Sequence, residues 1–381
     1  MSIWDELVGQ EAAIDEVRRA AEPGSESMTH AWLIVGPAGS GRSTLARAFA
    51  ATLVTAGKDE PAIVAQVLAG SHPDVTVLAT DRVTISIDEV RQLVSQSYFS
   101  PSVAPYRVII MEDADRMTER TSNVLLKALE EPPPRTVWVL CAPSAEDVLP
   151  TIRSRARVIT LRTPTPEHVA DLIVRREGVS PDVALLAATE AQSHVGMAMR
   201  LATDSEARER REETVRAVLT LGSVSQAVTM AQRLVEIATD DQKALLEKLD
   251  QEERDHTLRS MGLEPSQSIP QALRGQLKTL EENQKRRHTR SLRDGVDRIL
   301  IDVTSVLRDI LILQMNSDVA LVNARFRSEL EQRAAETTAQ QTLAALDDVR
   351  VARQRIESNT PPLLALEALL IGVSGRVPLS S

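Results

Sequence analysis

Several residue types are scarce in this chain of 381 residues, and each scarcity excludes a class of protein. Cys141 is the single cysteine, so no disulfide can form within the chain and a cysteine-rich zinc site is excluded. Aromatic residues make up only 2%, so the core must be built from Leu, Ile, Val and Ala. At 43% hydrophobic residues, the composition is that of a globular protein.

Positive charge and long apolar runs are also lacking. The net charge is −10, whereas a protein that binds DNA alone needs a basic surface. No run of about 18 apolar residues could span a membrane. Residues 1–6 have no basic and apolar segments of a signal peptide. We therefore expect a cytoplasmic protein with no membrane contact.

Short apolar runs alternate with helical stretches up to about residue 162. Continuous Val, Ile and Leu runs indicate strands that are covered on both faces of a parallel sheet. The five strand candidates are Ala31–Val35, Val75–Ala79, Arg107–Met111, Val137–Cys141 and Val158–Leu161. Ser86 and Glu89 have capping-box spacing at the start of a helix. A second helix should begin at Thr118 and end before the prolines at 132–134. This alternation predicts an α/β core with helices on both faces of the sheet.

After residue 166 the pattern contains only helical stretches. We expect an α/β domain over 1–165, a small helical lid over 166–204 and an all-α C-terminal domain over 205–381. Two apolar stripes at helical spacing mark packed faces of the last domain. They consist of Leu300, Val303, Leu307, Ile310 and Leu311, and of Leu363, Leu364, Leu366, Leu369 and Leu370.

The segment from Gly36 to Ser43 follows a predicted strand and opens a predicted helix. Its sequence, GPAGSGRS, matches the P-loop pattern G-x-x-x-x-G-K-[ST] at every position but one. Glycines let backbone N–H groups face a phosphate, and the helix N-terminus adds partial positive charge. The alternative is an ordinary glycine-rich turn between strand and helix. The candidate phosphate-binding residues are Gly36, Gly39, Gly41, Arg42, Ser43 and Thr44.

The exception is Arg42, where the pattern has lysine. A lysine ammonium is compact and fits between the β- and γ-phosphates, whereas the guanidinium is a wider planar group. Backbone contacts to a phosphate would survive this exchange. We do not expect Arg42 to position a γ-phosphate as lysine does.

A pair of acids, Glu112 and Asp113, ends another apolar strand. The P-loop pattern resembles that of AAA+ proteins, which place Asp-Glu at this position as the Walker B motif. In this chain the two acids stand in the opposite order. Glu112 could hold Mg²⁺ together with Ser43, whereas Asp113 is one methylene too short to polarise an attacking water well. The alternative is an acidic helix N-terminus. Ser144 follows the next strand, where these proteins carry a polar sensor, although most such serines only cap or turn the chain.

Several further motifs occur in one order over residues 1–165. They are His30-Ala31, His72-Pro73-Asp74, Ile87–Arg91, Leu125–Pro133 and Leu149–Ala156. The last of these resembles the Leu-Pro-Thr-Ile-x-Ser-Arg-Cys segment of clamp-loader proteins, a branch of the AAA+ family. That resemblance implies that Arg155 points out of its own subunit and contacts ATP bound by the next one. The alternative for Arg155 is a surface salt bridge.

The departures from the motor subunits indicate which members of this branch the chain resembles. Arg42 replaces the P-loop lysine, Met197 stands where a second-sensor arginine is expected, and residues 50–71 contain no zinc-binding cysteines. An altered ATPase site with a retained trans-acting arginine is similar to the delta-prime family of bacterial DNA polymerase III clamp loaders.

This resemblance implies a function and a set of partners. The chain would join the tau/gamma motor subunits and the delta subunit, and the complex would load the sliding clamp on primed DNA. It would bind ATP or ADP with Mg²⁺, without zinc, and its C-terminal domain would join a collar. Two alternatives stay open: an active motor ATPase of the tau/gamma type, and a stand-alone DNA-binding AAA+ protein. The altered residues disfavour the first, and the acidic balance disfavours the second.

Overall fold

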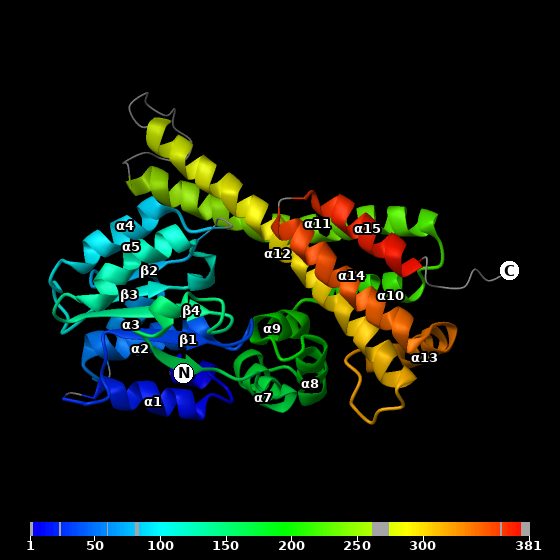
Figure 1. The fold of residues 1–381 in the computed structure, drawn as a ribbon, viewed down its shortest axis with the longest axis horizontal. Coiled ribbons are helices and arrows are strands. Elements are labelled where there is room, and N and C mark those ends of the chain that lie inside the picture. Colours follow the sequence, from blue (N-terminus) through cyan, green and yellow to red (C-terminus); the bar gives the residue numbers. More distant parts are fainter. Residues whose placement is uncertain are drawn as a thin grey trace. The chain divides into compact units, whose positions relative to one another are not determined.

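The computed structural model describes residues 3–22, 24–58, 60–80, 84–260, 274–358 and 360–374 (Figure 1). The chain divides into two compact units, residues 1–203 and 204–381, each described by itself below. The first unit contains both the α/β core and the segment predicted as a lid. The division into three domains stays a prediction.

Five parallel strands form one sheet in the first unit, in the order β2-β3-β4-β1-β5. They are β1 (Ala31–Val35), β2 (Val75–Leu78), β3 (Arg107–Met111), β4 (Thr136–Ala142) and β5 (Arg157–Thr160). The five predicted strands are thereby confirmed, with ends shifted by at most one residue. In the register, Leu33 lies opposite Leu140 on one side and Val158 on the other. Every residue of β1, β3 and β4 is buried, as their continuous apolar sequences indicated.

Helices cover both faces of this sheet (Figure 1). One layer contains α1 (Glu11–Ala21), α2 (Arg42–Thr55) and α3 (Pro61–Leu68); the other contains α4 (Ile87–Ser97) and α5 (Glu119–Glu130). Successive strand residues point to opposite faces. Trp32 therefore packs with α2, where its ring meets Phe49 edge-on at 5.1 Å, while Leu33 packs with α4 and α5. Short helical turns complete the core at η1 (Ile3–Glu6), η2 (Ala114–Arg116) and α6 (Pro150–Arg153).

The helices begin where the local sequence predicted. The Ser86 hydroxyl accepts from the N–H of Glu89 while the Glu89 carboxylate accepts from the N–H of Ser86, so the capping box of α4 is present. Thr118 caps α5, which ends before Pro132. These caps satisfy backbone N–H groups that a helix N-terminus leaves without partners.

Three helices follow the sheet within the first unit: α7 (Pro166–Glu177), α8 (Pro181–Glu190) and α9 (Val195–Thr203). The connection from β5 is held by Gln10, whose side-chain amide donates to the Arg162 carbonyl at 2.6 Å and accepts from the Arg162 N–H at 3.1 Å. An ion pair of 3.3 Å between Glu6 and Arg176 adds a contact from η1 to α7. These contacts position the three helices against the P-loop side of the core.

The second unit consists of helices throughout its described residues. They are α10 (Ser205–Leu219), α11 (Val224–Ser260), α12 (Arg274–Gln314), η4 (Ala324–Phe326), α13 (Arg327–Glu336), α14 (Ala339–Glu357) and α15 (Pro362–Ser374). Its core contains Leu300, Val303, Leu307 and Ile310 from α12, as the first apolar stripe predicted. From the second stripe, Leu366, Leu369 and Leu370 are buried, whereas Leu364 is exposed. No helix in the described ranges is long and apolar enough to cross a membrane.

Candidate nucleotide-binding site

The P-loop lies between the end of β1 and the start of α2. Gly39 and Gly41 have φ angles of +77° and +96°, a left-handed conformation that favours glycine. A Cβ on Gly39 would lie 2.5 Å from Cγ of His194, so a side chain there would also collide with the lid. The N–H of Ser40 donates to the Pro37 carbonyl and closes the turn. This conformation directs the loop over the N-terminus of α2.

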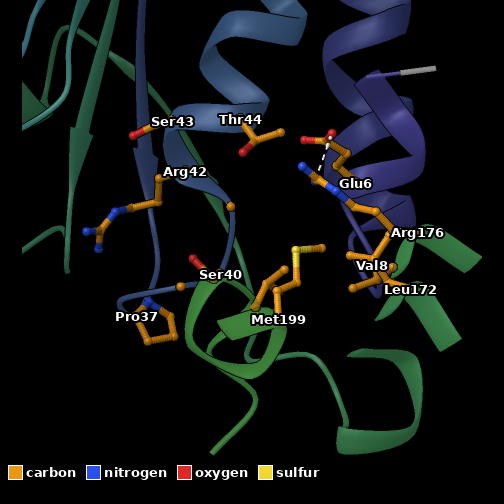
Figure 2. Close-up of a pocket in the computed structure, with 14 residues that line it drawn as sticks. Glu6, Val8, Pro37, Ser40, Arg42, Ser43, Thr44, Leu172, Arg176 and Met199 are labelled. Atoms are coloured by element: carbon orange, nitrogen blue, oxygen red, sulfur yellow. Dashed lines mark hydrogen bonds and ion pairs between the residues drawn. The ribbon is translucent and has the colours of Figure 1, made fainter. Parts of the chain in front are cut away.

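A cavity of about 320 Å³ lies against this loop, at the small end of the range for ligand sites. Its lining contains Gly39, Gly41, Arg42, Ser43 and Thr44, so the structure brings these predicted residues together (Figure 2). The remaining lining residues are Glu6, Val8, Pro37, Ser40, Leu172, Arg176, Val195, Gly196 and Met199. Of the predicted set, Gly36 lies below the cavity, where its N–H donates to the carbonyls of Ala142 and Pro143.

The side chain of Arg42 folds back onto its own loop. Its Nη1 donates to the carbonyl oxygen of Gly36. In Figure 2 the guanidinium points away from Thr44 and from Met199 of the lid. The basic group on the lid side of the cavity is instead Arg176, which pairs with Glu6.

The two acids that follow β3 have different partners. A carboxylate oxygen of Glu112 pairs with Nη2 of Arg47 on α2 at 2.8 Å, and the Glu112 side chain is only 16% exposed. Asp113 accepts from the N–H of Thr80 at 3.3 Å and lies 3.6 Å from Nε of Arg116. Both carboxylates are therefore held by groups of the chain itself.

Two further titratable groups, Cys141 and Asp115, lie close enough to these charges for their pKa values to be affected. Burial raises the pKa of the Cys141 thiol to about 12, and the carboxylate of Glu112 adds to this effect. Burial likewise raises the pKa of Asp115, with a smaller contribution from Asp113. The thiol donates to the Arg42 carbonyl across 3.9 Å. Cys141 is thus a buried core residue, as its position in β4 indicated.

Ser144 lies in the turn that follows β4, beside the first residue of the P-loop. Its N–H donates to Oδ2 of Asp147 at 3.0 Å, which is the geometry of a local polar turn. This contact fits the simpler interpretation of Ser144 as a turn residue. Its role as a sensor stays a prediction.

Arg155 lies just beyond α6, on the surface of the first unit. Its Nη2 pairs with Glu130 at the end of α5 across 2.6 Å, and its Nη1 donates to the Thr151 carbonyl and the Ser154 hydroxyl. The Arg155 side chain is 36% exposed and lies outside the lining of the cavity. The surface salt bridge that we kept as the alternative is therefore present in the isolated chain, and the guanidinium remains accessible from outside.

Comparisons with known proteins show what this chain is similar to. A family described as "DNA polymerase III, delta subunit" matches residues 9–165. The subunit delta′ of DNA polymerase III from Pseudomonas aeruginosa is 36% identical over 157 residues, which cover 39% of this chain and 47% of that protein. Over residues 9–165, this chain is similar to the DNA polymerase III clamp-loader family. Its parallel sheet with helices on both faces is the α/β core predicted from the sequence.

The similarity extends to more than one kind of clamp-loader subunit. Subunit gamma/tau from Mycobacterium tuberculosis is 32% identical over 190 residues, covering 47% of this chain and 32% of that protein. The chain thus matches less than half the length of either relative. A gamma-subunit-related structure from Thermotoga maritima aligns with 96% of this chain and 99% of its own, with 16% identity and a TM-score of 0.45.

Helix α9 brings a methionine to the P-loop. We expected Met197 at the second-sensor position, but the structure turns Met199 toward the loop (Figure 2). The N–H of Met197 instead donates to Nδ1 of His194 at the start of the helix. The sequence did not show where α9 begins, so it could not tell which side of the helix faces the P-loop. The structure starts α9 at Val195, and Met199 then faces the loop. The residue beside the P-loop is a methionine in either register.

Two arginines near the P-loop were missed in the sequence analysis. Arg47 lies one turn after Ser43 on α2, so the i, i+4 rule places both on one face and could have indicated it. Arg176 lies on α7, more than a hundred residues after the P-loop, and no sequence signal connects it to the cavity. Both are basic groups in contact with acids beside the predicted phosphate site.

Proposed function

We propose that this chain is a delta-prime-type subunit of the DNA polymerase III clamp loader. In this role it does not hydrolyse ATP itself but supplies Arg155 to the ATP site of a neighbouring tau/gamma subunit. The observation that carries this proposal is the contrast between the two sites. The chain's own Walker B acids are held by Arg47, Thr80 and Arg116, whereas Arg155 lies on the surface with its guanidinium accessible.

The chain's own site is poorly arranged for turnover. Phosphoryl transfer depends on positioning and on charge stabilisation at the γ-phosphate. Arg42 donates to the carbonyl of Gly36 and points away from the lid side of the cavity. Asp113 is shorter than the glutamate expected to orient water, and it already accepts from the N–H of Thr80. The cavity and the glycine conformations favour retained binding of ATP or ADP without hydrolysis.

The chemistry of Arg155 suits action on a second subunit. Its planar guanidinium can pair with two oxygens of a phosphate, as it does with carboxylates. Its present partner, Glu130, is itself 48% exposed, so a phosphate can replace it without loss of a buried contact. The complex would include tau/gamma, delta, the sliding clamp and primed DNA, and would act in the cytoplasm. An acidic chain fits a role in which other subunits hold the DNA.

The similarity to gamma/tau supports a second candidate, an active motor subunit. One experiment separates the two. ATPase activity is measured for the chain alone, then for tau/gamma and delta with and without it, in the presence of clamp and primed DNA. We expect negligible turnover alone and stimulation in the complex. Turnover by the isolated chain that is lost in Ser43→Ala would overturn the proposal and favour the motor.

A further inference from the structure

The ion pair between Arg47 and Glu112 involves the acid that we expected to hold Mg²⁺ together with Ser43. Ser43 and Arg47 lie one turn apart on the same face of α2, and Glu112 follows the adjacent strand β3. The pair is short, at 2.8 Å between Nη2 and Oε1. Glu112 is 16% exposed and Arg47 34% exposed, so solvent screens this pair less than a surface pair.

A resident Mg²⁺ does not fit these residues. Mg²⁺ needs octahedral oxygen ligands, commonly a hydroxyl and one or two carboxylates. We expected Ser43 and Glu112 to supply them, but the Glu112 carboxylate is paired with a cation of the chain. The next carboxylate, Asp113, lies against Arg116 and the N–H of Thr80. A divalent cation here would meet the charge of Arg47 and would have to displace it.

A phosphate fits the same site well. Gly39 and Gly41 adopt the left-handed conformations that turn backbone N–H groups toward an anion. Helix α2 has fourteen residues and its N-cap residue is Gly41, which has no side chain to cap it, so its first N–H groups are available to a ligand. Ser40 is 4% exposed, and among the described residues its hydroxyl has no hydrogen-bond partner. Such a buried polar atom is costly unless a ligand or water satisfies it.

We propose that Arg47 replaces the divalent cation, so that this site binds the phosphates of a nucleoside di- or triphosphate without metal. Arg47 neutralises Glu112, which would otherwise repel the phosphates, and adds positive charge one turn below Ser43. This deepens the proposed function, because it rests on the cavity being a nucleotide site. It also gives a physical reason for binding without hydrolysis, since no metal is present to draw charge from the γ-phosphate.

The test uses a fluorescent N-methylanthraniloyl derivative of ADP and the full chain. Its affinity is measured by titration in excess EDTA and in millimolar Mg²⁺. For the unaltered chain we expect affinities that agree within about threefold. Arg47→Gln should bind roughly tenfold more weakly in EDTA, because the negative charge of Glu112 is then unpaired and repels the phosphates. Mg²⁺ should restore its binding, because Glu112 becomes available to the metal.

Two variants serve as controls. Arg91→Gln removes an exposed arginine on α4 and should bind like the unaltered chain in both buffers. Arg47→Lys keeps the charge and should bind in EDTA, so it remains informative if Arg47→Gln folds poorly. The inference is overturned by binding that is lost in EDTA, by no binding in either buffer, or by Arg47→Gln behaving like Arg91→Gln. None of these outcomes affects the trans role of Arg155, which is tested separately in the assembled complex.

Discussion

Replacement of Arg155 by alanine distinguishes its two possible roles, because a surface ion pair and a trans-acting arginine contribute very different free energies. In the isolated chain the change removes an ion pair to Glu130 and hydrogen bonds to Thr151 and Ser154. Both charged side chains are at least 36% exposed, and pairs of this kind contribute at most about 1 kcal/mol. A trans-acting arginine instead accelerates phosphoryl transfer about 10³–10⁵-fold at its site. At 1.4 kcal/mol per tenfold, this corresponds to roughly 4–7 kcal/mol.

We therefore expect Arg155→Ala to assemble normally and to melt within a few degrees of the unaltered chain. The DNA- and clamp-stimulated ATPase activity of the complex should fall in part, because only the one bordering site fails. Clamp loading should fall further if the sites act together. Arg155→Lys should rescue poorly, because an ammonium lacks the planar fork.

A matched control lies two residues away. Arg153 is the last residue of α6, is 39% exposed and pairs loosely with Glu146 at 3.9 Å. Arg153→Ala should leave both assembly and ATPase activity unchanged. Unchanged ATPase activity and loading in a fully assembled Arg155→Ala complex would refute the trans role. Impaired assembly with normal activity per complex would support the structural role instead.

Two further predictions concern buried groups of the first unit. Burial opposes ionisation of Asp74, but N–H groups of Ser102, Val103 and Ala104 and the charge of Arg107 outweigh it and lower its pKa. The ionised Asp74 side chain should contribute its full share of the free energy of unfolding above about pH 4, and this share should be lost as the pH falls through the lower folded-state pKa. Urea unfolding at several pH values measures this loss. Asp74→Ala should lower the free energy of unfolding by about 3–5 kcal/mol. The Cys141 thiol, with a pKa raised to about 12, should not react with a thiol reagent at pH 8 until urea unfolds the chain. Rapid labelling of folded protein would contradict this.

Features that depend on neighbouring residues were predictable from the sequence. The strands were evident because a run such as Val108–Met111 is apolar at every position, as burial on both faces requires. The caps at Ser86 and Thr118 involve residues three positions apart, and the P-loop glycines are required by local backbone conformation. These features arise from contacts within one turn or one strand.

The tertiary structure alone decided which charges meet. Glu112 and Arg47 are separated by 65 residues and come together because the order β3-β4-β1 places the end of β3 near α2. Similarly, docking of α7 and α9 against the core brings Arg176 and Met199 to the cavity. The sequence alone therefore determined the α/β core and the glycine-rich loop between β1 and α2. Only the packing of distant elements decided that Arg47 pairs with Glu112.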